Sequence, residues 1–456
     1  MSRPARGLVA AVAIVVVAAV VGAGLFLSVG PGSSGGSAHG APRYVEETAT
    51  SGLVHTFDGG ITALTGGGVA VFDCDGDGRP DVYLAGGDHP AELFRNASRV
   101  GGALQFTKVQ GSGTDLGVVT GAYPIDIDSD GVADLAVLRV GGTELLRGLG
   151  GCRFEPADDA WGVQPSPAWT TAFSATWEGD NALPTLAFGN YVSIDAAGQP
   201  TSGCADNELF RPVEAATTAT GGYGPAVLLA PGYCTLSILF SDWDGSGRRD
   251  LRVTNDRHYY ATGNDQLWRV ATGEAPREYT AADGWVPMQI WGMGIASQDL
   301  SGDGLPEVYL TSQGDNKLQS LMAGPTQPAY HDIALAKGVT AAQPYAGGEA
   351  LPSTAWHPEF EDVNNDGLID LFVSKGNVGE VPDYATKDPS NLLLGQPDGT
   401  FVEGAPAAGI VSFDRGRGAA LVDFNQDGLL DLVEANLGAP VRLWRNVGSG
   451  TAEAPA

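Results

Sequence analysis

A nine-residue pattern, Asp-x-Asp-x-Asp-Gly-x-x-Asp or a close variant, occurs six times in this chain. Every copy has an oxygen-bearing side chain at positions one, three, five and nine, and a glycine at position six. The copies span residues 73–81, 126–134, 242–250, 299–307, 362–370 and 423–431. A unit that recurs at such intervals cannot bury a core alone, so the pattern predicts an array of stacked structural repeats.

The second and third copies are separated by about twice the usual interval, which predicts a seventh repeat between them. Residues 177–185 fit this frame and are followed by an apolar run, but they lack the oxygen-bearing pattern. We therefore expect seven repeats, six of which carry an acidic loop.

Each loop lies between a glycine-rich apolar run and a second run of alternating apolar residues, and two further short runs follow. Short period-2 runs separated by turn residues are typical of β-strands, and four strands per repeat are typical of propeller blades. The sequence thus predicts an all-β fold, a seven-bladed β-propeller with calcium loops over residues 44–447. Residues 44–53 resemble residues 401–410, so we expect residues 44–48 to form the outer strand of blade seven.

The loops favour calcium, because this ion prefers six to eight oxygen ligands, often with a backbone carbonyl at position seven of the loop. An EF-hand is excluded, since position 12 is glutamate only at Glu434 and the flanks read as strands. The alternative is a set of Asp- and Gly-rich turns without metal. We expect up to six calcium ions with a structural role. The predicted metal ligands, with position seven contributing its carbonyl, are Asp73, Asp75, Asp77, Arg79, Asp81, Asp126, Asp128, Asp130, Val132, Asp134, Asp242, Asp244, Ser246, Arg248, Asp250, Asp299, Ser301, Asp303, Leu305, Glu307, Asp362, Asn364, Asp366, Leu368, Asp370, Asp423, Asn425, Asp427, Leu429 and Asp431.

The amino-terminal segment predicts a membrane anchor. Residues 8–29 are apolar and uncharged, and they are long enough to span a bilayer. Arg3 and Arg6 place residues 1–7 in the cytoplasm and the rest outside, with a flexible linker at 30–43 and a disordered tail at 448–456. The alternative is cleavage near residues 38–41, which would release a secreted protein. A net charge of −29 excludes nucleic acid as a partner.

Four cysteines lie in the part expected outside the cell, where disulfides persist. In the predicted topology Cys74 and Cys152 fall on the rim of the loops, and Cys204 and Cys234 fall on the opposite rim. Topology therefore prefers the pairs Cys204–Cys234 and Cys74–Cys152 among three possible connectivities.

The loops, their glycine-rich lead-ins and the recurring Leu-Trp/Phe-Arg-Asn strands resemble the VCBS/FG-GAP repeat proteins, whose propeller is similar to the integrin α-subunit head. The segments at 44–53 and 401–410 are most similar to bacterial relatives of cartilage acidic protein. The resemblance implies a propeller with calcium and often surface adhesion or ligand binding, and it implies no reaction.

The rim opposite the loops is the candidate ligand site. Links that enter the inner strands there contribute Trp169, Trp291, Trp356, Arg415 and Arg417. The alternative is that these tryptophans pack between blades. No serine-hydrolase, zinc-protease or phosphate-loop motif occurs, so no catalytic residue is assigned. We expect a surface binding or adhesion module for an extracellular protein or carbohydrate; the alternative is a polysaccharide lyase or hydrolase on the same scaffold.

Overall fold

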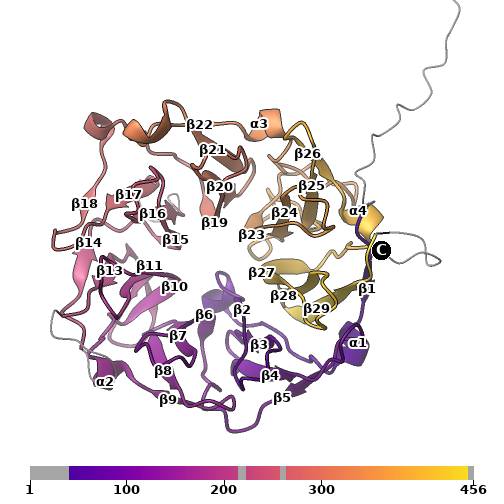
Figure 1. Cartoon of the computed structure of the whole chain (residues 1–456), viewed down its shortest axis with the longest axis horizontal. Coiled ribbons are helices and arrows are strands. Elements are labelled where there is room, and N and C mark those ends of the chain that lie inside the picture. The colour runs from indigo at the N-terminus through magenta and orange to yellow at the C-terminus, as the bar shows by residue number, and fades with distance from the viewer. Residues whose placement is uncertain (1–40, 214–221, 257–262, 450–456) are drawn as a thin grey trace, which may run out of the picture. The chain divides into compact units, whose positions relative to one another are not determined.

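The computed structural model describes residues 41–213, 222–256 and 263–449. In this part of the chain, seven antiparallel sheets stand around a common centre (Figure 1). Within each sheet the strands follow one another from the innermost to the outermost, in chain order except in blade seven. The predicted all-β, seven-bladed propeller is confirmed.

The first three blades have these strands. Blade one contains β2 (Val69–Phe72), β3 (Asp81–Leu84), β4 (Glu92–Asn96) and β5 (Phe106–Lys108); blade two contains β6 (Val119–Ile125), β7 (Asp134–Arg139), β8 (Glu144–Gly148) and β9 (Phe154–Pro156). Blade three contains β10 (Ala168–Thr176), β11 (Thr185–Ile194), β13 (Asn207–Phe210) and β14 (Val227–Leu229), with a fifth strand, β12 (Pro200–Cys204), that pairs with the extended end of β11. The fifth strand was not predicted.

The remaining blades follow the four-strand plan. Blade four contains β15 (Thr235–Ser241), β16 (Asp250–Asn255), β17 (Gln266–Arg269) and β18 (Arg277–Glu278); blade five contains β19 (Gly292–Gln298), β20 (Glu307–Ser312), β21 (Lys317–Leu321) and β22 (Tyr330–Asp332). Blade six contains β23 (Ala355–Glu361), β24 (Asp370–Lys375), β25 (Asn391–Gly395) and β26 (Phe401–Glu403); blade seven contains β27 (Arg415–Val422), β28 (Asp431–Leu437), β29 (Ala439–Asn446) and β1 (Tyr44–Glu46).

Single helical turns follow several outer strands. They are α1 (Thr48–Ser51), α2 (Asp158–Trp161), η2 (Ala281–Asp283), α3 (Ala334–Lys337) and α4 (Ala405–Ala408); η1 (Ile61–Ala63) and η3 (Gly324–Thr326) lie elsewhere. Each of the first five ends on a glycine in the left-handed conformation, as at Gly52 and Gly409, which L-residues with a Cβ rarely adopt. The next residue, such as Leu53 or Ile410, is buried. This arrangement explains why segments 44–53 and 401–410 look alike.

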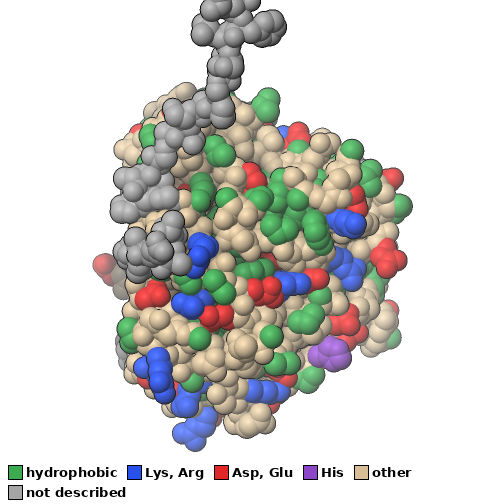
Figure 2. Space-filling view, turned by 90° about the vertical axis from the view of Figure 1, so that its right-hand side faces the viewer, with side chains coloured by type: hydrophobic (Ala, Val, Ile, Leu, Met, Phe, Trp, Pro, Cys, Tyr) green, Lys and Arg blue, Asp and Glu red, His purple; other side chains and the backbone are tan. Residues whose placement is uncertain are grey.

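The ring closes as predicted, through pairing of the first and last strands. Tyr44 lies opposite Asn446, and Glu46 lies opposite Trp444. Arg442 forms an ion pair with Glu46 at 3.0 Å. Thr48 belongs to α1, so the strand is shorter than the expected 44–48. Figure 2, which looks onto this side of the molecule, shows acidic and basic side chains interspersed.

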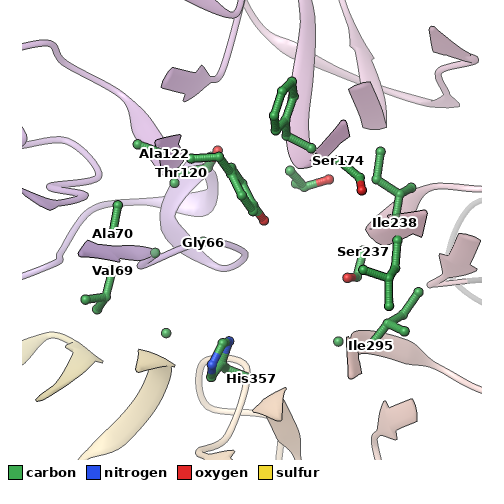
Figure 3. Close-up of a pocket in the computed structure, with 18 of the residues that line it drawn as sticks. Gly66, Val69, Ala70, Thr120, Ala122, Ser174, Ser237, Ile238, Ile295 and His357 are labelled. Carbon is green, nitrogen blue, oxygen red and sulfur yellow. The ribbon is translucent and has the colours of Figure 1, made fainter. Parts of the chain in front are cut away.

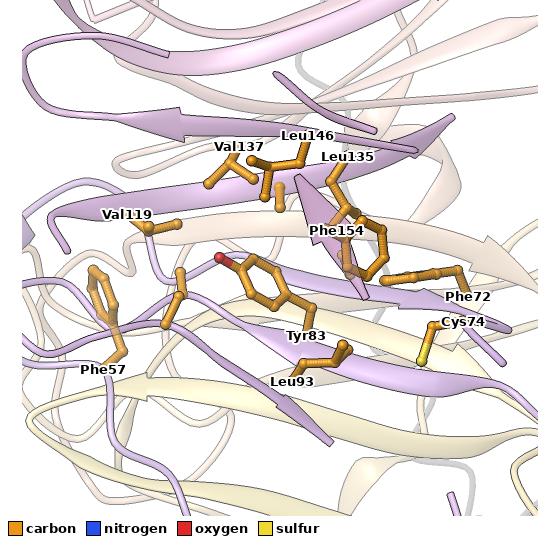
Figure 4. Packing of buried hydrophobic residues seen from close by; sticks show 14 of the residues in the cluster. Phe57, Phe72, Cys74, Tyr83, Leu93, Val119, Leu135, Val137, Leu146 and Phe154 are labelled. Carbon is orange, nitrogen blue, oxygen red and sulfur yellow. The ribbon is translucent and has the colours of Figure 1, made fainter. Parts of the chain in front are cut away.

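The core lies between adjacent blades rather than in one central mass. Between blades one and two, Phe72 meets Phe154 edge to face, with ring centroids 6.1 Å apart (Figure 4). The Tyr83 hydroxyl crosses the same interface and donates to the carbonyl of Thr114 at 3.0 Å. Such inter-blade packing fixes the direction of every inner strand, so the loops between first and second strands share one rim.

Two disulfides tie neighbouring segments together. Cys74 is bonded to Cys152, which links the loop of blade one to the outer turn of blade two. Cys204 is bonded to Cys234, which links β12 to the connection that enters β15. These are the two pairings that topology favours.

The predicted cytoplasmic stub at 1–7, the predicted spanning segment at 8–29, most of the linker at 30–43 and residues 450–456 of the tail lie outside the described residues. Among the residues that are described, no helix is both long enough and apolar enough to cross a membrane.

Candidate metal centres and central channel

The acidic loops share one backbone scaffold, which the position-one aspartate organises. In blade one, Asp73 accepts hydrogen bonds from the amides of Gly76 and Gly78, each at 2.8 Å. The position-one aspartates of the other five acidic loops accept the corresponding bond from their own position-six amide. The position-six glycine has a φ of 81° to 87° in all six loops, a left-handed conformation that explains the requirement for glycine.

The position-nine acid is buried and joins each loop to the third strand of its blade. Asp81 accepts hydrogen bonds from the amides of Cys74 in the loop and Asn96 in β4, at 2.9 and 2.8 Å. Asp134, Asp370 and Asp431 make the equivalent pair of bonds. The position-nine carboxylate is therefore part of the blade whether or not it binds an ion.

Within loop one, and likewise within loop two, the carboxylate oxygens lie close enough together to bind one cation per loop. Within the described residues, Asp73, Asp75 and Asp81 offer carboxylate oxygens that lie within 4.8 Å of one another, as do Asp126, Asp128 and Asp134. Like charges this close repel unless a cation lies between them. This spacing fits a calcium ion.

Two position-three oxygens are also left without a hydrogen-bond donor. Oδ1 of Asp128 in loop two and Oδ1 of Asn425 in loop seven are both buried and unpaired. Buried polar atoms nearly always have a partner. An ion in each loop would supply that partner, so these two loops fit calcium as well.

Burial changes the acidity of four of the position-nine aspartates. It raises the pKa of Asp81 to about 6, of Asp134 and Asp370 to about 7, and of Asp431 to about 8. Bonds from two backbone amides partly offset this effect, and the neighbouring loop carboxylates add to it. Because these values lie above the pKa of an exposed aspartate, the folded chain binds more protons than the unfolded chain.

A pH dependence follows for the calcium-free chain. In EGTA, we expect the melting temperature to rise as the pH falls from about 8 to about 5, because protonation relieves the buried charge. In saturating calcium the charged form is favoured, so the dependence should flatten. Thermal melts at several pH values with and without calcium measure this; a calcium-free melting temperature that falls over the same range contradicts it.

Each loop is numbered here by its blade. Loop three, the loop of blade three, holds a guanidinium group instead of acidic ligands. Glu178 is buried and receives bonds from Nε and Nη2 of Arg211 at 2.7 and 3.0 Å, and from the hydroxyl of Thr185 at 2.6 Å. Thr185 occupies position nine. This repeat was predicted to lack calcium ligands, and in the structure the guanidinium of Arg211 provides a positive charge in its loop. The sequence alone did not identify this arginine.

The inner strands enclose a central channel with a cavity of about 800 Å³. Small and apolar side chains such as Ala70, Ser237 and Ile295 form much of its wall, and His357 also lines it (Figure 3). Nε2 of His357 lies 3.3 Å from a carboxylate oxygen of Glu359. The channel has the size of a small-molecule site.

Two of the five candidate ligand residues, Trp356 and Arg417, line this channel, and three of the five are buried. Trp169 and Trp356 are 3% and 8% exposed and belong to one hydrophobic cluster, against which Trp291 also packs. Arg417 is 1% exposed and lies over the Trp356 ring at 4.2 Å. Its guanidinium donates to backbone carbonyls, as does that of the half-buried Arg415. The structure thus brings Trp356 and Arg417 together at the channel wall, without an exposed aromatic platform among these residues.

Six of the seven antiparallel blades carry an Asp-rich loop between their first and second strands, which is the pattern of FG-GAP-like repeats in a propeller. The FG-GAP-like repeat family matches residues 73–137 and 362–434, which lie in blades one, two, six and seven, so the chain is a propeller that contains FG-GAP-like repeats. It is similar to cartilage acidic protein 1 of Homo sapiens, with 26% identity over 229 residues, and of Mus musculus, with 27% over 230 residues. These matches cover 46% of this chain and 31% and 32% of the relatives, so the chain spans about a third of their length.

One solved structure, of BBS1N in complex with ARL6DN, aligns with 90% of this chain and with all of the matched chain. The TM-score is 0.49 and the sequence identity is 11%.

Proposed function

We propose that this protein is a non-catalytic binding or adhesion module that a membrane anchor holds on the extracytoplasmic side, with calcium as a structural ion in its loops. The observation that carries the calcium part is the loop geometry. In loops one and two, the shared backbone scaffold holds carboxylate oxygens within 4.8 Å of one another. In loops two and seven, a buried oxygen of the position-three side chain has no hydrogen-bond donor.

Two features support a location outside the cytoplasm. The described residues contain two disulfides, which are rare in the reducing cytosol. Loops of this kind need only weak affinity where calcium is at millimolar concentration, as it is outside cells. The apolar run at 8–29 supplies the proposed anchor.

The binding part of the proposal rests on the scaffold and its channel. The fold belongs to FG-GAP propellers, and the cavity of about 800 Å³ is lined by residues from all seven inner strands or the links that enter them. The ligand would be an extracellular carbohydrate or protein group that enters this cavity.

A glycan-array screen of the full chain tests the proposal. We expect glycan binding that EGTA abolishes, since loss of calcium loosens the blades that form the channel. The variant Ser237→Trp, which places a large side chain on the channel wall, should bind weakly, whereas Thr50→Trp on the exposed turn α1 should bind normally. Binding that is equal for both variants contradicts the channel as the site. Release of shortened or unsaturated glycan products would instead indicate an enzyme.

A further inference from the structure

The loop of blade four differs from the other acidic loops because one arginine contacts the carboxylates of both position three and position nine. In loop two, by comparison, Arg147 pairs with the position-three aspartate, Asp128, at 2.8 Å. Nη2 of Arg248, at position seven, lies 3.2 Å from Oδ2 of Asp244 and 3.0 Å from Oδ2 of Asp250. Nε of the same side chain donates to Oδ1 of Asp250 at 2.9 Å. The guanidinium therefore contacts the carboxylates of positions three and nine, both of which a calcium ion would need.

The position-nine carboxylate of this loop has no capacity left for a metal. Asp250 accepts the two bonds from Arg248, one from the indole of Trp243 at 2.8 Å, one from the hydroxyl of Tyr279 at 2.8 Å and one from the amide of Val270 at 3.0 Å. A carboxylate offers about four lone-pair sites. The equivalent aspartates of loops one, two, six and seven each receive two bonds from backbone amides.

Position five explains why the arginine turns inward here. Loop one also has an arginine at position seven, but Arg79 contacts the position-five aspartate, Asp77, at 3.5 Å. In loop four, position five is Ser246, which offers a hydroxyl and no charge. Arg248 therefore finds its nearest acidic partners at positions three and nine.

Loop three shows that the fold tolerates a guanidinium in a loop of this kind. There, Arg211, which directly follows the third strand β13, donates to Glu178, and the position-nine residue, Thr185, donates to the same carboxylate. Blades three and four thus both complete their loops with an arginine, although the two side chains come from different positions.

We infer that the loop of blade four holds the guanidinium of Arg248 in place of a calcium ion, so that the chain binds at most five ions. This inference rests on the proposed calcium binding by the other loops. A calcium ion would have to displace a cation that already neutralises the same carboxylates, and the two cations would repel each other.

Counting bound calcium tests the inference. The full chain and its variants are dialysed against about 1 mM calcium, a level that suits weak extracellular loops, and ions per chain are measured by mass spectrometry of the metal. We expect at most five ions in the wild type. Asp126→Asn, at position one of loop two, should remove one ion, whereas Asp242→Asn, at the same position of loop four, should leave the count unchanged.

A gain of binding provides the complementary test. The double variant Ser246→Asp/Arg248→Leu frees the carboxylates and restores an acid at position five, so it should bind one ion more than the wild type. Arg79→Leu is the matched control and should leave the count unchanged. Terbium emission excited through Trp243 should appear in the double variant and disappear when Trp243→Phe is added.

Two results would overturn the inference in distinguishable ways. Six ions in the wild type, or loss of one ion in Asp242→Asn, shows that loop four binds calcium and leaves the proposed function intact. A wild-type chain without any bound calcium overturns the proposed calcium loops and this inference with them.

Discussion

Removal of calcium with EGTA should lower the melting temperature of the full chain by several degrees. An ion that binds the folded loop but not the unfolded chain stabilises the folded state by linkage. For dissociation constants of about 10⁻⁴ to 10⁻³ M and about 1 mM calcium, each occupied loop contributes roughly 0.4–1.4 kcal/mol. Five loops would together contribute roughly 2–7 kcal/mol, which corresponds to roughly 2–8 °C for a domain of about 400 residues.

The measurement is a thermal melt followed by circular dichroism in calcium, in EGTA, and in EGTA with calcium restored. Magnesium at the same concentration should restore less of the shift, because it prefers octahedral geometry and retains its waters. Asp423→Asn, which removes the position-one ligand of loop seven, should reduce the calcium-dependent shift, while Asp180→Asn in loop three should not. Superimposable melts with and without calcium contradict a structural role.

The repeat architecture could be predicted because its determinants are local in the sequence. Each loop needs a glycine at position six for its left-handed turn, and each flanking strand shows alternation of apolar residues. The closure was also predictable, because residues 44–53 carry the same outer-strand, helical-turn and glycine pattern as residues 401–410.

The partners of charged side chains could not be predicted, because they depend on tertiary contacts. Arg211 lies 33 residues from Glu178, and only the register of β11 and β13 brings them together. Serine at position five of loop four was visible in the sequence, yet the inward turn of Arg248 also depends on the Tyr279 hydroxyl. Burial of Trp169 and Arg417 likewise follows from the packing of several blades.

Position nine of the loops shows a second limit of prediction from the sequence. The sequence predicts a metal ligand at this position, but in the structure the same carboxylate also bonds to backbone amides of the blade. Asp431, for example, bonds to the amides of Phe424 and Asn446 and so connects the loop to β29. A substitution there would weaken the blade even without calcium.

Deletion of residues 44–52 should destabilise the propeller by about 5 kcal/mol or more. The deletion removes β1 and α1 and with them Tyr44, which is 5% exposed and donates from its hydroxyl to the carbonyl of Leu430 at 2.9 Å. Loss of a buried aromatic side chain alone costs about 3–5 kcal/mol. The deletion also breaks the ion pair of Arg445 with Glu47 and leaves β29 as an open edge.

Urea denaturation of the full chain and of the deletion variant measures this loss. Val45→Ala is the matched control, because Val45 lies in the same strand but is 40% exposed, so its free energy of unfolding should change by less than about 0.5 kcal/mol. A synthetic peptide of residues 44–52 should restore part of the lost stability by pairing with β29 in trans. A deletion variant that unfolds at the same urea concentration as the wild type would show that the strand does not hold the ring closed.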